Sequence, residues 1–259
     1  MAKSTSSAVP PIFAPLELSG VSATSHTLRL GDEKVWIHVY EREGSTLTFV
    51  NLHDDENTSA EAARSYISKN GGRLIELRHG RGRDVVIRRR EYHAQFDPNR
   101  MFTAAGLSKS LSWNGKLTEE NVQLGLEFST AIAQIIDIDH EPVIIAVHNN
   151  TQGRLTIRDF QPGQWYGDDA KQVNISRGRD SDDFFFTNSP QIFAGLSRLQ
   201  YNVALMSDDP PDRGTLGRRV NSQGGTYVNV EAQHGHLKEQ IEMLESLVQV
   251  IASIAANRN

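Results

Sequence analysis

The sequence predicts an α/β domain. Short apolar runs rich in β-branched residues, as at 47–52 and 142–147, alternate with amphipathic patterns of helical period, as at 118–136. The run at 142–147 is almost continuously apolar, which is typical of a strand that helices cover on both faces. At 259 residues the chain can bury a sizeable core, and we expect one domain over 21–259 after an N-terminal arm over 1–20.

The elements follow one another in a regular order. We predict helices at 59–69, 118–136, 189–199 and 236–255, and strands at 27–30, 35–40, 47–52, 73–77, 84–90, 142–147, 202–206 and 226–231. The first two strands form a hairpin across Gly31 and Asp32. Thr58 and Glu61 fit a capping box that opens the first helix. Residues 152–186 have no clear periodicity, and we expect loops there that wall a site.

The composition excludes several classes of function. The formal net charge is −5 and the arginines cluster only locally, so nucleic acid is not an expected partner. No stretch approaches the ~20 apolar residues that cross a bilayer, so we expect no membrane partner either. The chain has no cysteine, and any metal must be held by His, Asp or Glu. No secretory signal is visible in the first twenty residues, which favours the cytoplasm. A periplasmic or secreted chain trimmed of its signal would look the same.

Two histidines follow apolar strands. His53 comes directly after the run at 47–52, with Glu56 three residues later. His148 comes directly after the run at 142–147. In open α/β sheets, ligands gather at the carboxyl ends of strands, so both histidines would lie on the same edge. Imidazole and carboxylate are good zinc ligands, and a catalytic zinc typically has three protein ligands and a water. The alternatives are a solvated acidic loop around Glu56 and a core histidine at 148.

Three further polar residues, in a loop and at a strand end, are candidates for the site. Asn99 and Arg100 follow a proline that holds the preceding residue extended, so we expect a rigid loop that presents them. Glu231 ends the strand at 226–231. His234 and His236 are rival metal ligands, although we expect them to cap the last helix or line the site.

Together, these residues resemble the zinc carboxypeptidase superfamily, which includes the metallocarboxypeptidases and the succinylglutamate desuccinylase and aspartoacylase branch. The segment Asp-Pro-Asn-Arg-Met-Phe at 97–102 is similar to the family's Asp-x-Asn-Arg-x-Phe motif. The resemblance implies a mixed, mostly parallel twisted sheet flanked by helices. It implies one zinc ion held by His53, Glu56 and His148.

The same resemblance implies the remaining roles. Asn99 and Arg100 would bind a substrate carboxylate, and Glu231 would be the general base. An arginine that polarises the scissile carbonyl would come from Arg88, Arg89 or Arg90, and which of them does so stays open. Tyr227 alternates with Glu231 along one strand, so it would share its face and is a further candidate for substrate binding.

The function we expect is a zinc-dependent hydrolase that cleaves an amide bond next to a free carboxylate, a carboxypeptidase-like metallopeptidase. Its partner would be a small peptide or an acylated amino acid with a free carboxylate. The first alternative is an N-acyl amino acid deacylase of the desuccinylase and aspartoacylase type. The second is a catalytically inactive protein that keeps the fold and binds a carboxylate through Arg100.

Overall fold

The computed structural model describes residues 13–80, 82–90, 93–113 and 116–257. Across these residues the main sheet has nine strands in the order β1, β2, β4, β3, β7, β11, β9, β10, β8, and β5 and β6 form a separate two-stranded ribbon. The strands are β1 (Ser22–Leu30), β2 (Glu33–Arg42), β3 (Thr48–Asn51), β4 (Gly72–Arg78), β5 (Val85–Arg88), β6 (His93–Phe96), β7 (Val143–Asn150), β8 (Ala170–Asn174), β9 (Phe184–Thr187), β10 (Val203–Met206) and β11 (Thr226–Gln233).

The centre of the sheet is parallel and positions the site. β4, β3, β7 and β11 are neighbours that run in one direction, whereas β2 and β9 flank this group as antiparallel strands. The carboxyl ends of the four central strands therefore meet at one edge. The predicted mixed, mostly parallel sheet is confirmed, and so is the hairpin of β1 and β2.

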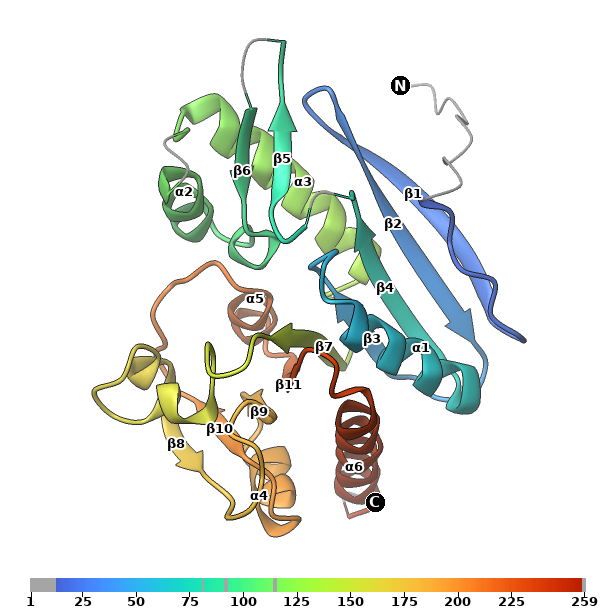
Figure 1. The fold of residues 1–259 in the computed structure, drawn as a ribbon, viewed down its shortest axis with the longest axis vertical. Coiled ribbons are helices and arrows are strands. Elements are labelled where there is room, and N and C mark those ends of the chain that lie inside the picture. Colours follow the sequence, from blue (N-terminus) through green and yellow to red (C-terminus); the bar gives the residue numbers. More distant parts are fainter. Residues whose placement is uncertain (1–12, 81, 91–92, 114–115, 258–259) are drawn as a thin grey trace.

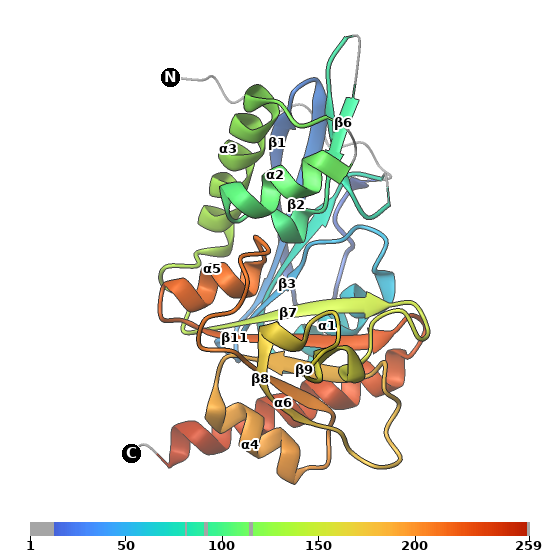
Figure 2. The ribbon, with the colours of Figure 1, turned by 90° about the vertical axis from the view of Figure 1, so that its left-hand side faces the viewer.

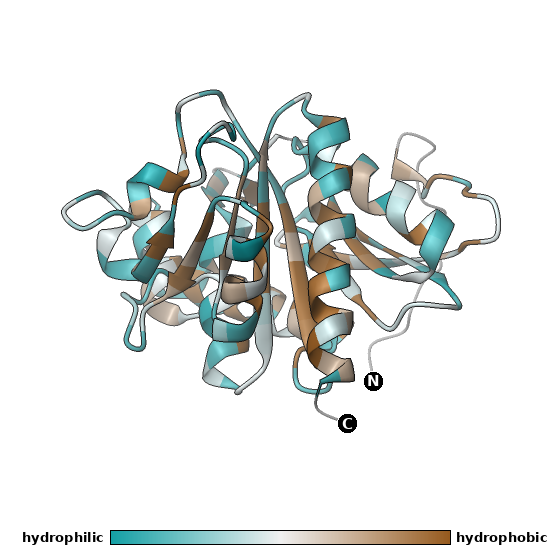
Figure 3. Ribbon diagram, turned by 90° about the horizontal axis from the view of Figure 1, so that it is seen from below, coloured by the Kyte–Doolittle hydropathy of each residue, from teal (hydrophilic) through white to brown (hydrophobic). Residues whose placement is uncertain are grey.

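Helices cover both faces of the sheet (Figures 1 and 2). On one face, α1 (Asn57–Asn70), α4 (Pro190–Arg198) and α6 (Leu237–Ala256) enclose one core cluster. On the other, α2 (Ala104–Trp113), α3 (Glu119–Ile136) and α5 (Leu216–Ser222) enclose a second, together with the β5–β6 ribbon. Figure 3 shows the apolar residues concentrated on the central strands and on the inner sides of these helices. Among the described residues, no helix combines the length and apolar character needed to cross a bilayer.

The structure corrects several sequence predictions about element ends. The capping box at α1 is wrong: Glu56 precedes the helix without a side-chain cap, and Thr58 Oγ1 instead accepts a hydrogen bond from the backbone N–H of Gly235 at 3.0 Å. β7 and β11 extend beyond the apolar runs, so His148 and Glu231 lie within strands rather than at their ends. The polar residues that suggested strand ends are instead the site-facing part of the sheet.

Other elements were not predicted. The strand β8 and most of β9 lie in the region 152–186, where we expected loops, and the strand β6 and the helices α2 and α5 were also not predicted. Most of the predicted N-terminal arm, residues 1–12, lies outside the described residues.

Candidate active site

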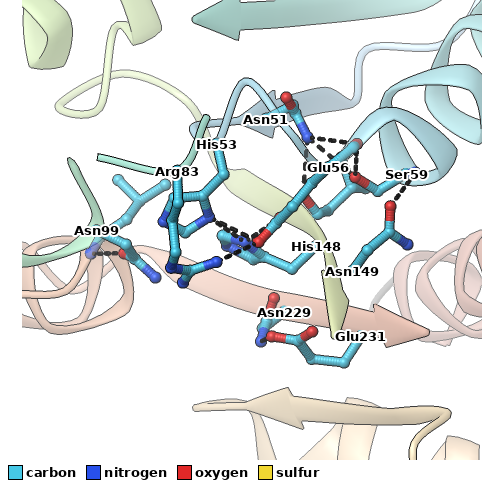
Figure 4. A network of polar contacts seen from close by, with 12 residues as sticks. Asn51, His53, Glu56, Ser59, Arg83, Asn99, His148, Asn149, Asn229 and Glu231 are labelled. Carbon is cyan, nitrogen blue, oxygen red and sulfur yellow. Dashed lines mark hydrogen bonds and ion pairs between the residues drawn. The ribbon is translucent and has the colours of Figure 1, made fainter. Parts of the chain in front are cut away.

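Three side chains, two from the turn between β3 and α1 and one from β7, meet at the carboxyl edge of the parallel strands (Figure 4). His53 follows β3, Glu56 immediately precedes α1, and His148 lies in β7; their exposed fractions are 0%, 4% and 2%. His53 Nδ1 lies 2.9 Å from Glu56 Oε1 and 3.1 Å from His148 Nδ1, and His148 Nδ1 lies 2.9 Å from Glu56 Oε2. Two imidazoles and a carboxylate thus face one point.

Buried hydrogen bonds fix the turn that carries His53 and Glu56. The N–H of Glu56 donates to the His53 carbonyl at 3.2 Å. Behind the turn, Asn51 Nδ2 donates to Ser59 Oγ at 2.9 Å, and Ser59 Oγ donates to the Glu56 carbonyl at 2.8 Å. Asn149 Oδ1 accepts from the N–H of Ser59 at 2.8 Å, which satisfies one of the orphan donors of the first helical turn. The Glu56 carboxylate is therefore not needed as a cap and can face the histidines.

Asp97 holds His53 from behind. His53 Nε2 donates to Asp97 Oδ1 at 2.8 Å, and the same oxygen accepts from the N–H of Asn99 at 2.8 Å. A hydrogen bond at one ring nitrogen fixes the tautomer and leaves the other nitrogen available as a metal ligand. The donor atom that His53 presents to the site is therefore Nδ1.

The charges around this point favour a cation. Burial lowers the pKa of His53, but the Glu56 and Asp97 carboxylates outweigh it and raise that pKa to about 9. Burial raises the pKa of Glu56, but His53 and His148 outweigh it and hold that pKa well below its usual value. Positive charge is thus stabilised where the three side chains meet, and a metal ion bound there would replace a proton.

The donor set and its spacing fit a zinc ion. Tetrahedral zinc with bonds of about 2.0–2.1 Å places its ligand atoms roughly 3.3 Å apart. The two imidazole nitrogens lie 3.1 Å apart, and each lies 2.9 Å from one of the two Glu56 oxygens, which is close to that value. Two imidazoles and one carboxylate also leave a fourth position for water or substrate, as in catalytic zinc sites. His53, Glu56 and His148 can therefore hold a metal ion.

Glu231 lies directly beside His148. The parallel pairing of β11 with β7 puts the two residues in register, and Glu231 is 6% exposed. Its Oε1 accepts from Asn229 Nδ2 at 3.2 Å, while Oε2 has no hydrogen-bond partner among the described residues. Burial raises the pKa of Glu231 above its usual value. A buried carboxylate with one unpartnered oxygen and a raised pKa suits proton transfer.

Asn99 and Arg100 lie on the 3-10 turn Pro98–Arg100, immediately after Asp97. Asn99 Oδ1 accepts from the N–H of Leu216 at 3.0 Å, which ties this turn to the start of α5. Arg100 Nη2 lies 3.4 Å from the Tyr166 hydroxyl. That contact is at the outer limit of a hydrogen bond, so the guanidinium remains available to a carboxylate ligand.

The arginine at the centre of the site is Arg83, which precedes β5. Its Nη1 donates to Glu56 Oε1 at 2.7 Å, and its Nη2 lies 3.5 Å from Asp97 Oδ2. Burial lowers the pKa of Arg83, but Asp97 and Glu56 outweigh it and raise that pKa above its usual range. The side chain is 47% exposed, so part of the guanidinium can reach a bound substrate.

The structure does not bring Arg88, Arg89 or Arg90 to the site. Arg88 pairs with Glu33, and Arg89 pairs with Glu120 at 2.6 Å. In the β5–β6 ribbon, Val85 pairs with Phe96, next to Asp97, whereas Arg88 pairs with His93 at the other end. Arg90 is exposed and follows Arg88 beyond that far end of the ribbon.

Tyr227 lies in the core rather than at the site. It shares the face of Glu231, as predicted, but four residues of strand separate them by about 13 Å. Its ring packs so closely beneath α5 that a Cβ on Gly217 would lie 2.6 Å from it. His234 is exposed, and His236 Nδ1 lies 3.2 Å from the Asp183 carboxylate, so neither is part of the three-residue cluster.

Sequence reasoning missed three contributors. Arg83 lies in a glycine-rich turn between β4 and β5, and its place at the site depends on the pairing of β5 with β6. Asp97 was noted only as part of a motif, whereas it binds His53. Tyr166 lies in the region without periodicity, where no pattern singled it out.

Comparisons with known proteins find distant structural similarity. No family model and no curated protein matches this chain. Among solved structures, it is similar to a candidate metallopeptidase from Shewanella denitrificans, with 12% identity over 88% of this chain and 82% of that one and a TM-score of 0.44. It is also similar to an aspartoacylase family protein from Mesorhizobium loti, with 12% identity over 93% and 69% of the two chains and a TM-score of 0.47.

A third similar structure is bovine thrombin-activatable fibrinolysis inhibitor, solved in complex with a tick carboxypeptidase inhibitor. It shares 11% identity over 91% of each chain, with a TM-score of 0.48. The roles of individual residues rest on the geometry of the site itself.

Proposed function

We propose that the protein is a zinc-dependent hydrolase that cleaves an amide bond next to a free carboxylate, as a carboxypeptidase-like metallopeptidase. One observation supports this above all. The donor atoms of His53, Glu56 and His148 converge in a buried position: the two Nδ1 atoms lie 3.1 Å apart, and each lies 2.9 Å from one of the two Glu56 oxygens. Glu231, a buried carboxylate with an unpartnered oxygen, stands in register beside them.

The metal would supply electrophilic polarisation of the carbonyl and a water of lowered pKa. Residues of the chain would bind the substrate, stabilise the developing charge and transfer the proton. Arg100 binds the substrate carboxylate through its planar fork, with the Asn99 turn beside it. Arg83 directs N–H groups at the carbonyl oxygen as negative charge develops on it. Glu231 takes a proton from the attacking water and passes it to the leaving nitrogen.

The test is hydrolysis by the zinc-loaded protein of short peptides and, separately, of N-acyl amino acids. We expect C-terminal residues to be released from peptides. In Glu231→Gln, the rate of this release should fall by about 10²- to 10⁴-fold. The matched control is Glu242→Gln, which changes an exposed carboxylate on α6 that lies 3.8 Å from Lys238. Cleavage of N-acyl amino acids with peptides left intact would establish the deacylase instead. A zinc-loaded protein that cleaves neither would contradict the proposal.

A further inference from the structure

Polar residues continue along the floor of the site past the candidate metal ligands. The pairing of β7 with β11 sets His148 beside Glu231 and, two residues further on, Asn150 beside Gln233. Residues two apart on a strand share a face. The intervening Asn149 turns to the opposite face, where its Nδ2 donates to Gln240 of α6 at 2.9 Å. Asn150 and Gln233 therefore lie on the face that carries the site.

Both side chains hold an acceptor that lacks a donor. Asn150 Oδ1 and Gln233 Oε1 are buried, and neither has a hydrogen-bond partner among the described residues. Asn150 is 8% exposed, and its Nδ2 donates to the Asp182 carbonyl at 2.8 Å, which fixes the amide with Oδ1 as its unpartnered atom. Buried polar atoms are almost always hydrogen-bonded, so two unpaired acceptors on adjacent strands indicate a donor that a ligand brings.

The surroundings of this pair are acidic. Asp183 Oδ1 accepts from the N–H of Gln233 at 2.9 Å, and Asp182 Oδ1 accepts from the N–H of Gly153 at 2.8 Å. The arginines of the site lie elsewhere. Asn99 bonds Leu216 of α5, and α5 packs on Tyr227 at the start of β11, so Gln233 lies beyond Glu231 on the side away from Asn99. The site is thus cationic at the end near Asn99 and acidic, with free acceptors, at the other.

We propose that Asn150 and Gln233 form a subsite for a protonated amine on the acyl side of the scissile amide. The direction of the substrate rests on the proposed function, in which its carboxylate lies at Arg100. Two residues of strand place Gln233 about 6–7 Å beyond Glu231. In an extended tripeptide, the terminal amine lies about 6 Å from the second carbonyl, which is the one that would be cleaved. The substrate class is therefore a short chain with a free carboxylate at one end and a free amine at the other.

Binding to a protein that cannot turn over tests the subsite. Zinc-loaded Glu231→Gln is titrated calorimetrically with trialanine and with N-propionyl-dialanine, which differs only by lacking the amine. Trialanine is expected to bind at least about tenfold more tightly, the usual effect of a hydrogen bond to a charged group. Adding Gln233→Met should reduce this preference to less than about threefold, and adding Gln233→Glu should increase it. Gln172→Met, at an exposed position on β8, is the matched control and should leave the preference unchanged.

Three results would overturn the subsite: equal binding of the two compounds, a preference that survives Gln233→Met, or no binding of either. Hydrolysis by the wild-type protein separates this inference from the proposed function. Cleavage of both compounds without an amine preference would leave the function standing and refute the subsite. An amine preference in binding, lost with Gln233→Met, in a protein that cleaves neither would support the subsite and refute the function.

Discussion

Replacing Asp97 by Asn should weaken zinc binding without unfolding the protein. Asp97 Oδ1 accepts from His53 Nε2 and from the N–H of Asn99, both at 2.8 Å, and an asparagine oxygen can keep both bonds. The charge is lost, however, and the amide nitrogen would replace Oδ2, which lies 3.5 Å from Arg83 Nη2. The amide N–H of the new asparagine would then face the N–H of Arg83 Nη2.

The magnitude follows from the change in the His53 hydrogen bond. A bond to a charged partner contributes about 1.5–3 kcal/mol and a neutral one about 1 kcal/mol, so the substitution should cost roughly 0.5–2 kcal/mol. That is a loss of about 2- to 30-fold in zinc affinity. It overlaps the range of about 10- to 100-fold commonly found when the partner of a metal-bound histidine is removed.

The assay is competition for zinc against a chromophoric chelator, with urea unfolding of the metal-free proteins beside it. Asp208→Asn is the control, because Asp208 is exposed and contacts only the Lys171 ammonium among the described residues. A folded Asp97→Asn protein that binds zinc as tightly as wild type would refute the assignment of Asp97 as the group that orients His53.

Three further predictions test other parts of the structure. Arg83→Gln should lower kcat/KM by about 10²-fold with one zinc retained, whereas Arg88→Gln should leave it nearly unchanged; the reverse outcome would contradict the placement of the site arginine. Burial lowers the pKa of His38 to about 4, so between pH 6.5 and 4 this histidine is protonated in the unfolded chain but not in the folded protein. The free energy of unfolding should therefore fall by at most about 3 kcal/mol as the pH drops from 6.5 to 4. In urea unfolding, His38→Gln should show a shallower fall than wild type, and an equal fall would refute this. A Cβ on Gly106 would lie 2.4 Å from Gly214 Cα, so Gly106→Ala should lower the free energy of unfolding by about 1–3 kcal/mol, and an unchanged urea midpoint would refute the close contact.

Much of the fold was predictable because its core elements carry strong patterns. The apolar run of β7 and the long amphipathic stretches of α3 and α6 gave correct element types with ends within a few residues. The short elements α2, α5, β8 and β9 were missed, since each owes its conformation to packing against neighbours rather than to a period of its own.

The sequence predicted the site residues whose position follows from the strand that carries them. It did not predict those whose position follows from how separate elements pair. His53, His148 and Glu231 come together because parallel strands bring their carboxyl ends to one edge. The choice between Arg83 and Arg88 depends on which end of the β5–β6 ribbon meets Asp97, and nothing local to the arginines reports that pairing. For Tyr227, the predicted face of the strand was right. Alternation alone does not tell how far along the strand a residue lies from the site.

Metal content tests the central claim most directly. After zinc reconstitution and removal of free metal, elemental analysis of wild type should find about one zinc per chain, because His53, Glu56 and His148 supply the three ligands of one catalytic site. His53→Ala and His148→Ala should each lose that zinc, while His140→Ala, at an exposed histidine beside Asp137, should keep it. A wild-type protein that holds no zinc, or His53 and His148 variants that retain it in full, would contradict the account.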